Sequence, residues 1–595
     1  MSSQQSPDFV IVGGGTAGLV VASRLSEDPS VNVLVLEAGQ DLTADPRVNI
    51  PGLFITLLGS EADWQFKTVA QPGLKNRLIQ QPRGKALGGS SAINGTTFVA
   101  PARTEINAWA ELGNPGWDWE GLAPYYKKFY TLVPPSDEET LKHLGLDWID
   151  DEYRGTDGPI KVSFPGVKEN PLVKAWIDAF RGMDKVTTGD PFSGKSTGGY
   201  SNAASIDPET KTRSYVATAY SLKGRPNVRI VTGVQVNKIL FDQSKPDSVV
   251  ASGVEAVVDG KQETFTAAKE VILAAGALAT PKLLELSGVG NPDVLAKYDI
   301  PVVLDLPGVG ENLQDHLMTG ISYEVADGVI TGDPLMRQEP EALAMAQKLY
   351  FEHKVGPLAA GGVQSYAFMP LQGEDANYDQ LLAKSTEDAA HVDLVRSIVD
   401  RKDESHSSSW FMFLAQANLH EGSESFVGTQ LLDGNYASLG CSQTHPFSRG
   451  SAHIASADPE AKPEIDPRYF SHPADLEIMA RHVQALDKLR HAPELKSFFK
   501  EDGRRNHPDA FEVASLEGAK KYVLDTATTT YHACGTAAML PKEKNGVVDP
   551  QLLVYGTKNV RVVDASLFPL IVRGNIMSSV YAVAEKAADV IKGTA

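Results

Sequence analysis

The length, composition and charge of the chain narrow its class. Its 595 residues, 42% hydrophobic and 22% charged, are typical of a globular protein with two domains, or with one large α/β domain that carries an inserted second one. A formal net charge of −20 argues against a nucleic-acid partner and disfavours an anionic membrane surface, since both require clustered lysine and arginine.

The first element along the chain is a candidate nucleotide-binding unit. Residues 8–12 (DFVIV) predict a buried parallel strand, which runs into a turn with the spacing G-x-G-x-x-G at Gly13, Gly15 and Gly18. An amphipathic helix and a second strand, 31–36, follow. The glycines permit the tight turn, the approach of a pyrophosphate and close helix packing, while the helix N-terminus attracts the anion.

The residue at the end of the second strand narrows the choice of nucleotide. Glu37 is placed to accept hydrogen bonds from the adenosine ribose and would repel a 2′-phosphate, so FAD or NAD is expected rather than NADP. The residues expected to bind the dinucleotide here are Gly13, Gly15, Thr16, Ala17, Gly18, Glu37 and Ala38.

A second glycine-rich stretch occupies residues 83–98. By composition alone it is either a flexible linker or a close-packed loop. Leu87, Ile93 and Phe98 favour the packed loop, because a solvated linker has no use for them. Such a loop can line an anionic or heteroaromatic ligand with its backbone N–H groups and hydroxyls.

The later elements are less distinctive taken alone. Strands are predicted over 228–240, 270–275 and 410–415, and helices with loops over 325–405. A strand ending at Asp564 is followed by a helix over 578–592. Locally, His532 among small residues is more often structural than catalytic, and Asn575 before a helix would be a cap.

Three stretches together resemble the glucose–methanol–choline (GMC) oxidoreductase family, and within it the aryl-alcohol oxidase and glucose dehydrogenase-like branch. The first runs from Gly84 through Gly88-Gly89-Ser90-Ser91 and Ile93-Asn94 to Pro101, and the second covers 276–290. The third is the C-terminal 65 residues, with Tyr531-His532-Ala533-Cys534-Gly535-Thr536. The resemblance brackets nearly the whole chain.

The resemblance implies an α/β fold in which a Rossmann-like FAD-binding domain with a parallel sheet is interleaved with an α+β substrate domain on an antiparallel sheet. The FAD-binding domain would comprise 1–160, 210–320 and 530–595, and the substrate domain 161–209 and 321–529.

The resemblance also implies how FAD is held. Some relatives tether the flavin through a histidine where this chain has Ile93, so FAD is expected to bind non-covalently. The further residues implied to bind FAD are Trp64, Gly89, Ser90, Asn94, Gly95, Thr96, Val236, Asp564, Ala565, Asn575, Ile576 and Met577.

For the reaction, the resemblance implies that His532 is the base and that Asn575 holds the substrate oxygen. The expected activity is oxidation of a primary, aromatic or sugar alcohol by hydride transfer to flavin N5, with oxygen, a quinone or another acceptor reoxidising the flavin. No metal is expected. Arg573, two residues before Asn575, is either a structural charge or a cation that attracts carboxylate-bearing substrates.

Two other functions remain open from the sequence. The same scaffold hosts hydroxynitrile lyases, in which FAD is not redox-active, although Asn575 argues against that site because those enzymes resemble the version with two histidines. An NAD-linked or non-catalytic binding protein is the other, but it has no need of the second glycine-rich stretch.

The sequence carries few signs of export or membrane insertion. It lacks a secretory signal and a long apolar run, it has only two cysteines, and its one glycosylation sequon, Asn94-Gly95-Thr96, falls in the motif expected to be buried. These features favour a cytoplasmic protein.

Overall fold

The two strands predicted on either side of the first glycine motif and its helix are neighbours inside a parallel sheet. The computed structural model describes residues 6–594 apart from 166–169, 188, 243–248, 374–379, 384–388, 402–406 and 429. In it, β1 (Phe9–Val12) pairs in parallel with β2 (Val33–Glu37) and with β14 (Glu270–Leu273). All four residues of β1 are buried, as its apolar run predicts.

The outer strands of this sheet come from distant parts of the chain. β10 (Val228–Thr232) lies beside β2, and β24 (Val560–Val562) lies beside β14, which gives the order β10-β2-β1-β14-β24. The single strand predicted over 228–240 is wrong. The chain turns at Gly233, whose φ of +71° suits glycine, and β11 (Val234–Phe241) joins a separate antiparallel sheet.

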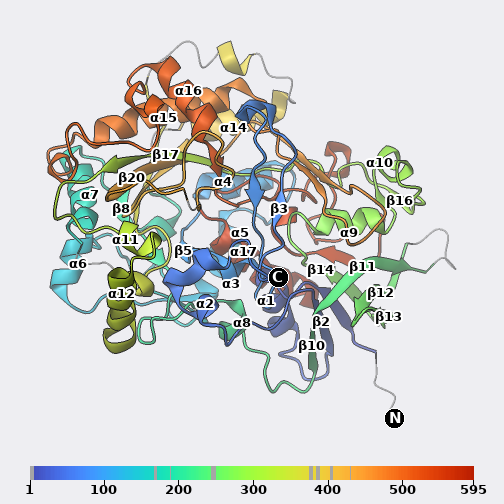
Figure 1. Cartoon of the computed structure of the whole chain (residues 1–595). Coiled ribbons are helices and arrows are strands. Elements are labelled where there is room, and N and C mark those ends of the chain that lie inside the picture. The colour runs from blue at the N-terminus through green and yellow to red at the C-terminus, as the bar shows by residue number, and fades with distance from the viewer. Residues whose placement is uncertain are drawn as a thin grey trace.

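The first and last long helices pack against each other, and the first also packs against the parallel sheet. α1 (Thr16–Leu25) contacts α17 (Met577–Lys592), and Arg24 of α1 forms ion pairs with Glu585 and, at 3.0 Å, with Asp589 of α17. Figure 1 shows these two helices close together beside the strands of the sheet. The first and last long helices of the described chain are therefore joined by ion pairs as well as by packing.

A second, antiparallel sheet has six strands and confirms the predicted combination of parallel and antiparallel sheets. The strands are, in spatial order, β23 (Thr528–Thr529), β17 (Leu317–Glu324), β20 (Tyr436–Gln443), β19 (Ser408–Phe413), β18 (Ser365–Met369) and β8 (Gly198–Ser201). β17 spans residue 320, so the expected domain boundary at that position falls inside a strand of this sheet. β18 lies within 325–405, where only helices and loops were predicted, so that part of the prediction is wrong; residues 374–379, 384–388 and 402–405 lie outside the described part.

The two faces of the antiparallel sheet differ in what covers them. Trp410 and Met412 of β19 pack against the core beneath α15 (Pro473–Leu489) and α16 (Leu516–Thr526), which Figure 1 shows above β17 and β20. The intervening Phe411 points to the opposite face, as strand alternation requires. That face lines the candidate site.

Within the described residues, no helix is both long and apolar enough to span a membrane. The two cysteines, Cys441 and Cys534, are buried and not joined in a disulfide.

Candidate active site

A cavity lies between the parallel sheet and the face of the antiparallel sheet to which Phe411 points. Its volume of about 720 Å³ is within the range of pockets that hold small molecules and cofactors. Of the residues predicted to bind cofactor or substrate, all but Gly18 line it. They are Gly13, Gly15, Thr16, Ala17, Glu37, Ala38, Trp64, Gly89, Ser90, Asn94, Gly95, Thr96, Val236, His532, Asp564, Ala565, Asn575, Ile576 and Met577.

Gly18 lies outside the lining because it serves helix packing. A Cβ atom there would lie 2.0 Å from the carbonyl oxygen of Gly13. Gly89 has a φ of +53°, and its Cβ would lie 2.7 Å from Cα of Gly15. The two glycine-rich loops therefore touch. Neither Gly18 nor Gly89 could be replaced by a residue with a side chain without displacing its neighbours.

Glu37 is held by the backbone of these loops. Its two carboxylate oxygens accept hydrogen bonds from N–H of Gly14 at 2.8 Å and from N–H of Gly39 at 2.7 Å. Burial raises the pKa of Glu37 to about 7, against the opposing effect of the two N–H donors. Each oxygen keeps a further lone pair with which it could accept from a ribose hydroxyl.

Asn94 ties the second glycine-rich stretch to the C-terminal helix. Its side-chain oxygen accepts from N–H of Thr96 at 3.0 Å and from Arg213 at 2.8 Å, and its amide donates to the sulfur of Met577 at 3.1 Å. The hydroxyl of Thr96 is buried and has no partner among the described residues. Since a buried polar group normally has one, this orphan indicates a polar ligand at the cavity wall.

The donors left open around the cavity suit an elongated, electron-rich ligand. α1 and α17 begin at the cavity, at Thr16 and Met577, and neither has a side-chain cap. Their free N–H groups and positive dipole ends favour anionic or electron-rich groups, such as a pyrophosphate and the pyrimidine edge of a flavin. These two helix N-termini fit a flavin dinucleotide. So do the unpaired hydroxyl of Thr96 and the contact between Gly15 and Gly89, which leaves space for a ligand near the backbone.

Asp564 organises the end of the parallel sheet next to that cavity. Its carboxylate accepts from N–H of Gly276 at 2.9 Å, from the hydroxyl of Thr280 at 2.6 Å and from N–H of Ser566 at 2.7 Å. Burial raises its pKa, while these hydrogen bonds act in the opposite direction. The network joins β14 and β24 where both meet the cavity.

His532 and Asn575 meet at the cavity wall. Nδ2 of Asn575 lies 3.0 Å from Nε2 of His532, and Nδ1 of His532 lies 2.8 Å from the hydroxyl of Thr530 and 2.9 Å from Nδ1 of His316. Burial lowers the pKa of His532 well below its ordinary value, and the positive charge of Arg83 acts in the same direction. His532 is therefore neutral at neutral pH, as a proton acceptor must be.

One part of the cavity lining is aromatic. Phe411 and Phe413 of β19 line the cavity together with Phe426 and Tyr531. Phe426 stacks on Tyr531, with ring centroids 5.1 Å apart, and on Phe413, with centroids 6.2 Å apart. A planar, apolar group would pack well against this surface.

Arg573 does not reach the cavity. Its guanidinium is buried, with 1% of the residue exposed, and it donates to the hydroxyl of Ser196 at 2.9 Å and to the carbonyl of Ala100 at 3.2 Å. It also lies 3.9 Å from the ring centroid of Phe368. The structural alternative for Arg573 thus fits these contacts, and a role in attracting carboxylates does not.

Sequence reasoning missed Asp315 and His316. Oδ1 of Asp315 accepts from the backbone N–H of both His316 and His532, each at 2.9 Å. Oδ2 accepts from Gln81, Tyr469 and Thr529. The only local signal was an adjacent acid and histidine just before β17, which does not reveal the partner 217 residues away.

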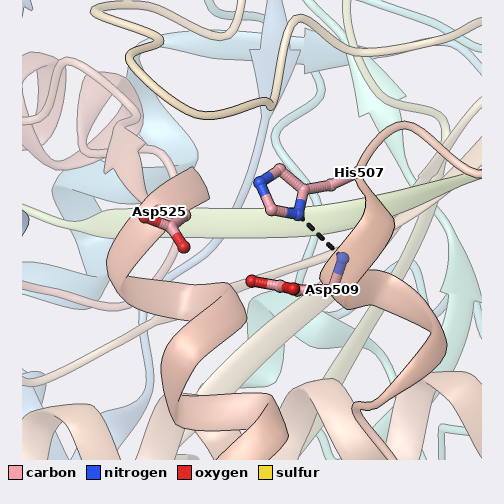
Figure 2. A group of neighbouring side chains, drawn as sticks. All are labelled: His507, Asp509 and Asp525. Atoms are coloured by element: carbon pink, nitrogen blue, oxygen red, sulfur yellow. Dashed lines mark hydrogen bonds between the residues drawn. The ribbon is translucent and has the colours of Figure 1, made fainter.

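A separate group, His507, Asp509 and Asp525, brings three candidate metal ligands within 4.8 Å of one another. Figure 2 shows Nδ1 of His507 accepting from the backbone N–H of Asp509, at 3.0 Å. Lys521 pairs with Asp509 at 3.0 Å, and Lys75 pairs with Asp525. The carboxylates are thus already neutralised, and the group is accounted for as a helix cap and two ion pairs.

Comparison with known proteins agrees with this architecture. The family models of the N-terminal and C-terminal GMC oxidoreductase domains match residues 7–318 and 446–584, respectively. A dehydrogenase of Armillaria gallica is 37% identical over an alignment of 619 positions, which covers 99% of this chain and 94% of that one.

Two solved structures share the fold over the whole chain. An FAD-dependent oxidoreductase from Chaetomium thermophilum superposes with a TM-score of 0.85 at 29% identity, and a fungal aryl-alcohol oxidase with a TM-score of 0.83 at 29% identity. Each match covers 99% of both chains. The chain therefore belongs to the GMC oxidoreductase family and is an FAD-dependent oxidoreductase.

Proposed function

We propose that the protein oxidises the CH–OH group of a small, uncharged alcohol, with His532 as the base and Asn575 as the group that holds the hydroxyl oxygen. The observation that carries the proposal is the 3.0 Å contact between Nε2 of the neutral His532 and the amide of Asn575 at the cavity wall. The hydroxyl group of a substrate can both donate and accept, so it could lie between these two side chains, donating to His532 and accepting from Asn575.

The two side chains would divide the work. Asn575 donates to the hydroxyl oxygen and holds it in place, while Nε2 of His532 accepts the hydroxyl proton as negative charge develops on that oxygen. An amide does not exchange protons at neutral pH, so the acid–base step falls to His532 alone. When bound, FAD supplies the acceptor for the hydride that leaves the same carbon.

The aromatic wall supports an aromatic alcohol over a sugar. Phe411, Phe413 and Phe426 offer ring faces and no hydrogen-bond partners, whereas a sugar needs several polar partners for its hydroxyls. Oxygen or a quinone would then reoxidise the flavin.

FAD would be held without a covalent bond. Ile93, 3% exposed in a small apolar cluster, has no group that could form one. The proposed FAD-binding domain, residues 1–160, 210–320 and 530–595, would carry the cofactor, and the antiparallel sheet would close over the substrate. Acid precipitation of the protein should leave all the yellow flavin in the supernatant; flavin retained in the pellet would contradict this.

The activity is tested with a panel of aromatic, aliphatic and sugar alcohols. Anaerobic bleaching of the flavin absorption identifies the substrate class, and peroxide formed in air identifies oxygen as acceptor. His532→Ala should slow anaerobic flavin reduction ~10²–10⁴-fold while FAD remains bound. His507→Ala, a change of the same kind at a histidine remote from the cavity, should not. Normal reduction in His532→Ala would remove it from the mechanism.

A further inference from the structure

Behind His532, on the side away from the cavity, lies a second histidine that the reaction as proposed does not use. His316 is 1% exposed, and its ring stands at 88° to that of His532, with centroids 5.2 Å apart. Its Nε2 lies 2.8 Å from the backbone carbonyl of Thr444 and its Nδ1 lies 2.9 Å from Nδ1 of His532. The two imidazoles thus form a buried series of hydrogen bonds that runs from the backbone carbonyl of Thr444 to the cavity.

We propose that His316 is a positioning residue, which fixes His532 in the tautomer that carries its proton on Nδ1 and presents a bare Nε2 to the substrate. This inference rests on the proposed function of His532 as base. His316 itself touches neither the cavity nor the reacting atoms.

The carbonyl group of Thr444 determines which atom donates in each of these hydrogen bonds. A carbonyl oxygen can only accept, so Nε2 of His316 must carry a proton and donate it to Thr444. Burial lowers the pKa of His316 to about 4, so above that pH the ring is neutral and its Nδ1 is bare. Nδ1 of His316 can then only accept, and Nδ1 of His532 must be the donor.

Two further contacts agree with this assignment. The hydroxyl of Thr530 donates to the backbone carbonyl of His316 at 3.1 Å, so toward Nδ1 of His532, at 2.8 Å, its oxygen is an acceptor. At the other end, the amide nitrogen of Asn575 can only donate, which requires a lone pair on Nε2 of His532. The carboxylate of Asp315 accepts from the backbone N–H of both histidines and so holds together the two backbone segments that carry the rings.

The consequence is chemical. A histidine with its proton on Nε2 would present a donor to the substrate hydroxyl and could not take its proton. In other enzymes a wrong tautomer of the catalytic histidine costs about 10⁴-fold in rate. His532 has two acceptors for its Nδ1 proton, His316 and Thr530, so the loss of one should be partly covered by the other.

The tautomer can be measured directly on the holoenzyme with ¹⁵N-labelled histidine. We expect the long-range ¹⁵N–¹H correlation pattern of His532, assigned by its loss in His532→Ala, to show a protonated Nδ1 and a bare Nε2. A protonated Nε2 in the wild-type protein would overturn the inference whether or not any variant folds.

Rates of anaerobic flavin reduction give the second readout. His316→Leu and Thr530→Val should each slow the reaction about 3–10-fold, and the double variant ~10²–10³-fold, more than the product of the two, because only the double variant lacks both acceptors. His316→Gln can donate to Thr444 and accept from His532, and should recover most of the rate. FAD content should be unchanged.

The His532→Ala background separates this inference from the proposed function. If His316 acts through His532, His316→Leu should cause no further loss there. An equal loss in both backgrounds would refute the positioning role and leave the base in place, whereas unimpaired reduction by His532→Ala alone would refute the proposed function.

Discussion

The amide nitrogen of Asn575 lies 3.0 Å from Nε2 of His532, so the residue at position 575 helps set the pH range over which His532 can accept a proton. Asn575→Asp would put a carboxylate at this distance and stabilise the imidazolium. The pKa of His532 should rise, and the acid limb of the pH profile for flavin reduction should move up by about 1–3 units.

Asn575→Ala is the control for that change. It removes the donor without adding a charge, so reduction should slow while the acid limb moves much less than in Asn575→Asp. Stopped-flow reduction from the lowest pH at which FAD stays bound up to pH 9 measures the wild-type protein and both variants. Identical profiles in the two would mean that position 575 has no electrostatic contact with the base.

The contact between the two glycine-rich loops should govern FAD affinity. In Gly89→Ala, the new Cβ would lie 2.7 Å from Cα of Gly15 and push the loops apart. We expect the dissociation constant for FAD to rise at least tenfold, or about 1.4 kcal/mol, in a titration of the apoprotein.

Gly224→Ala provides a matched control for backbone strain. Gly224 also has a positive φ, +83°, but no atom lies within 4 Å of its would-be Cβ. Both variants place an alanine at a positive φ, so the control accounts for that shared cost, while the clash with Gly15 and the ψ of −138° are particular to position 89. Equal FAD affinity in the two would show that the loop contact does not matter for binding.

The sequence predicted those parts of the site that obey local rules. The turn from β1 to α1 could be located because strand, glycines and acid must occur at fixed spacing. β18 was missed because Ser365–Met369 is a five-residue run within a stretch that has no clear period, and its burial comes from neighbours distant in sequence. The contact of His316 with His532 joins residues 216 apart and leaves no local pattern at all.

Arg573 is expected to stabilise the fold and not to affect the preference between charged and neutral substrates. Arg573→Met would remove a buried cation that packs on Phe368 and binds Ser196, and should lower the free energy of unfolding by about 3 kcal/mol. The ratio of kcat/KM for a carboxylate-bearing aromatic alcohol to that for its neutral parent should not change. Arg83→Met, which alters a cation in the cavity lining, should shift that ratio and serves as the positive control. A shifted ratio in Arg573→Met would restore its role in substrate selection.

A partly buried, ion-paired histidine that does not line the cavity should make stability fall at alkaline pH. Nδ1 of His453 lies 2.6 Å from Glu285 and Nε2 lies 3.1 Å from Glu311. Burial lowers the pKa of His453, but the two carboxylates outweigh it and raise the pKa to about 9. Because the folded-state value exceeds the ordinary 6.5, the stabilisation is fully present below pH 6.5 and is lost as the pH rises through 9.

The size of this effect follows from the same two values. Between pH 6 and pH 9.5, the wild-type protein should lose on the order of 3 kcal/mol of unfolding free energy that His453→Gln does not lose, since glutamine does not titrate. Urea unfolding at both pH values measures the difference. His353→Gln, at an exposed histidine 3.8 Å from its nearest carboxylate, should behave as the wild type. If the gap between wild type and His453→Gln were the same at both pH values, the pair would not be the source of any alkaline loss.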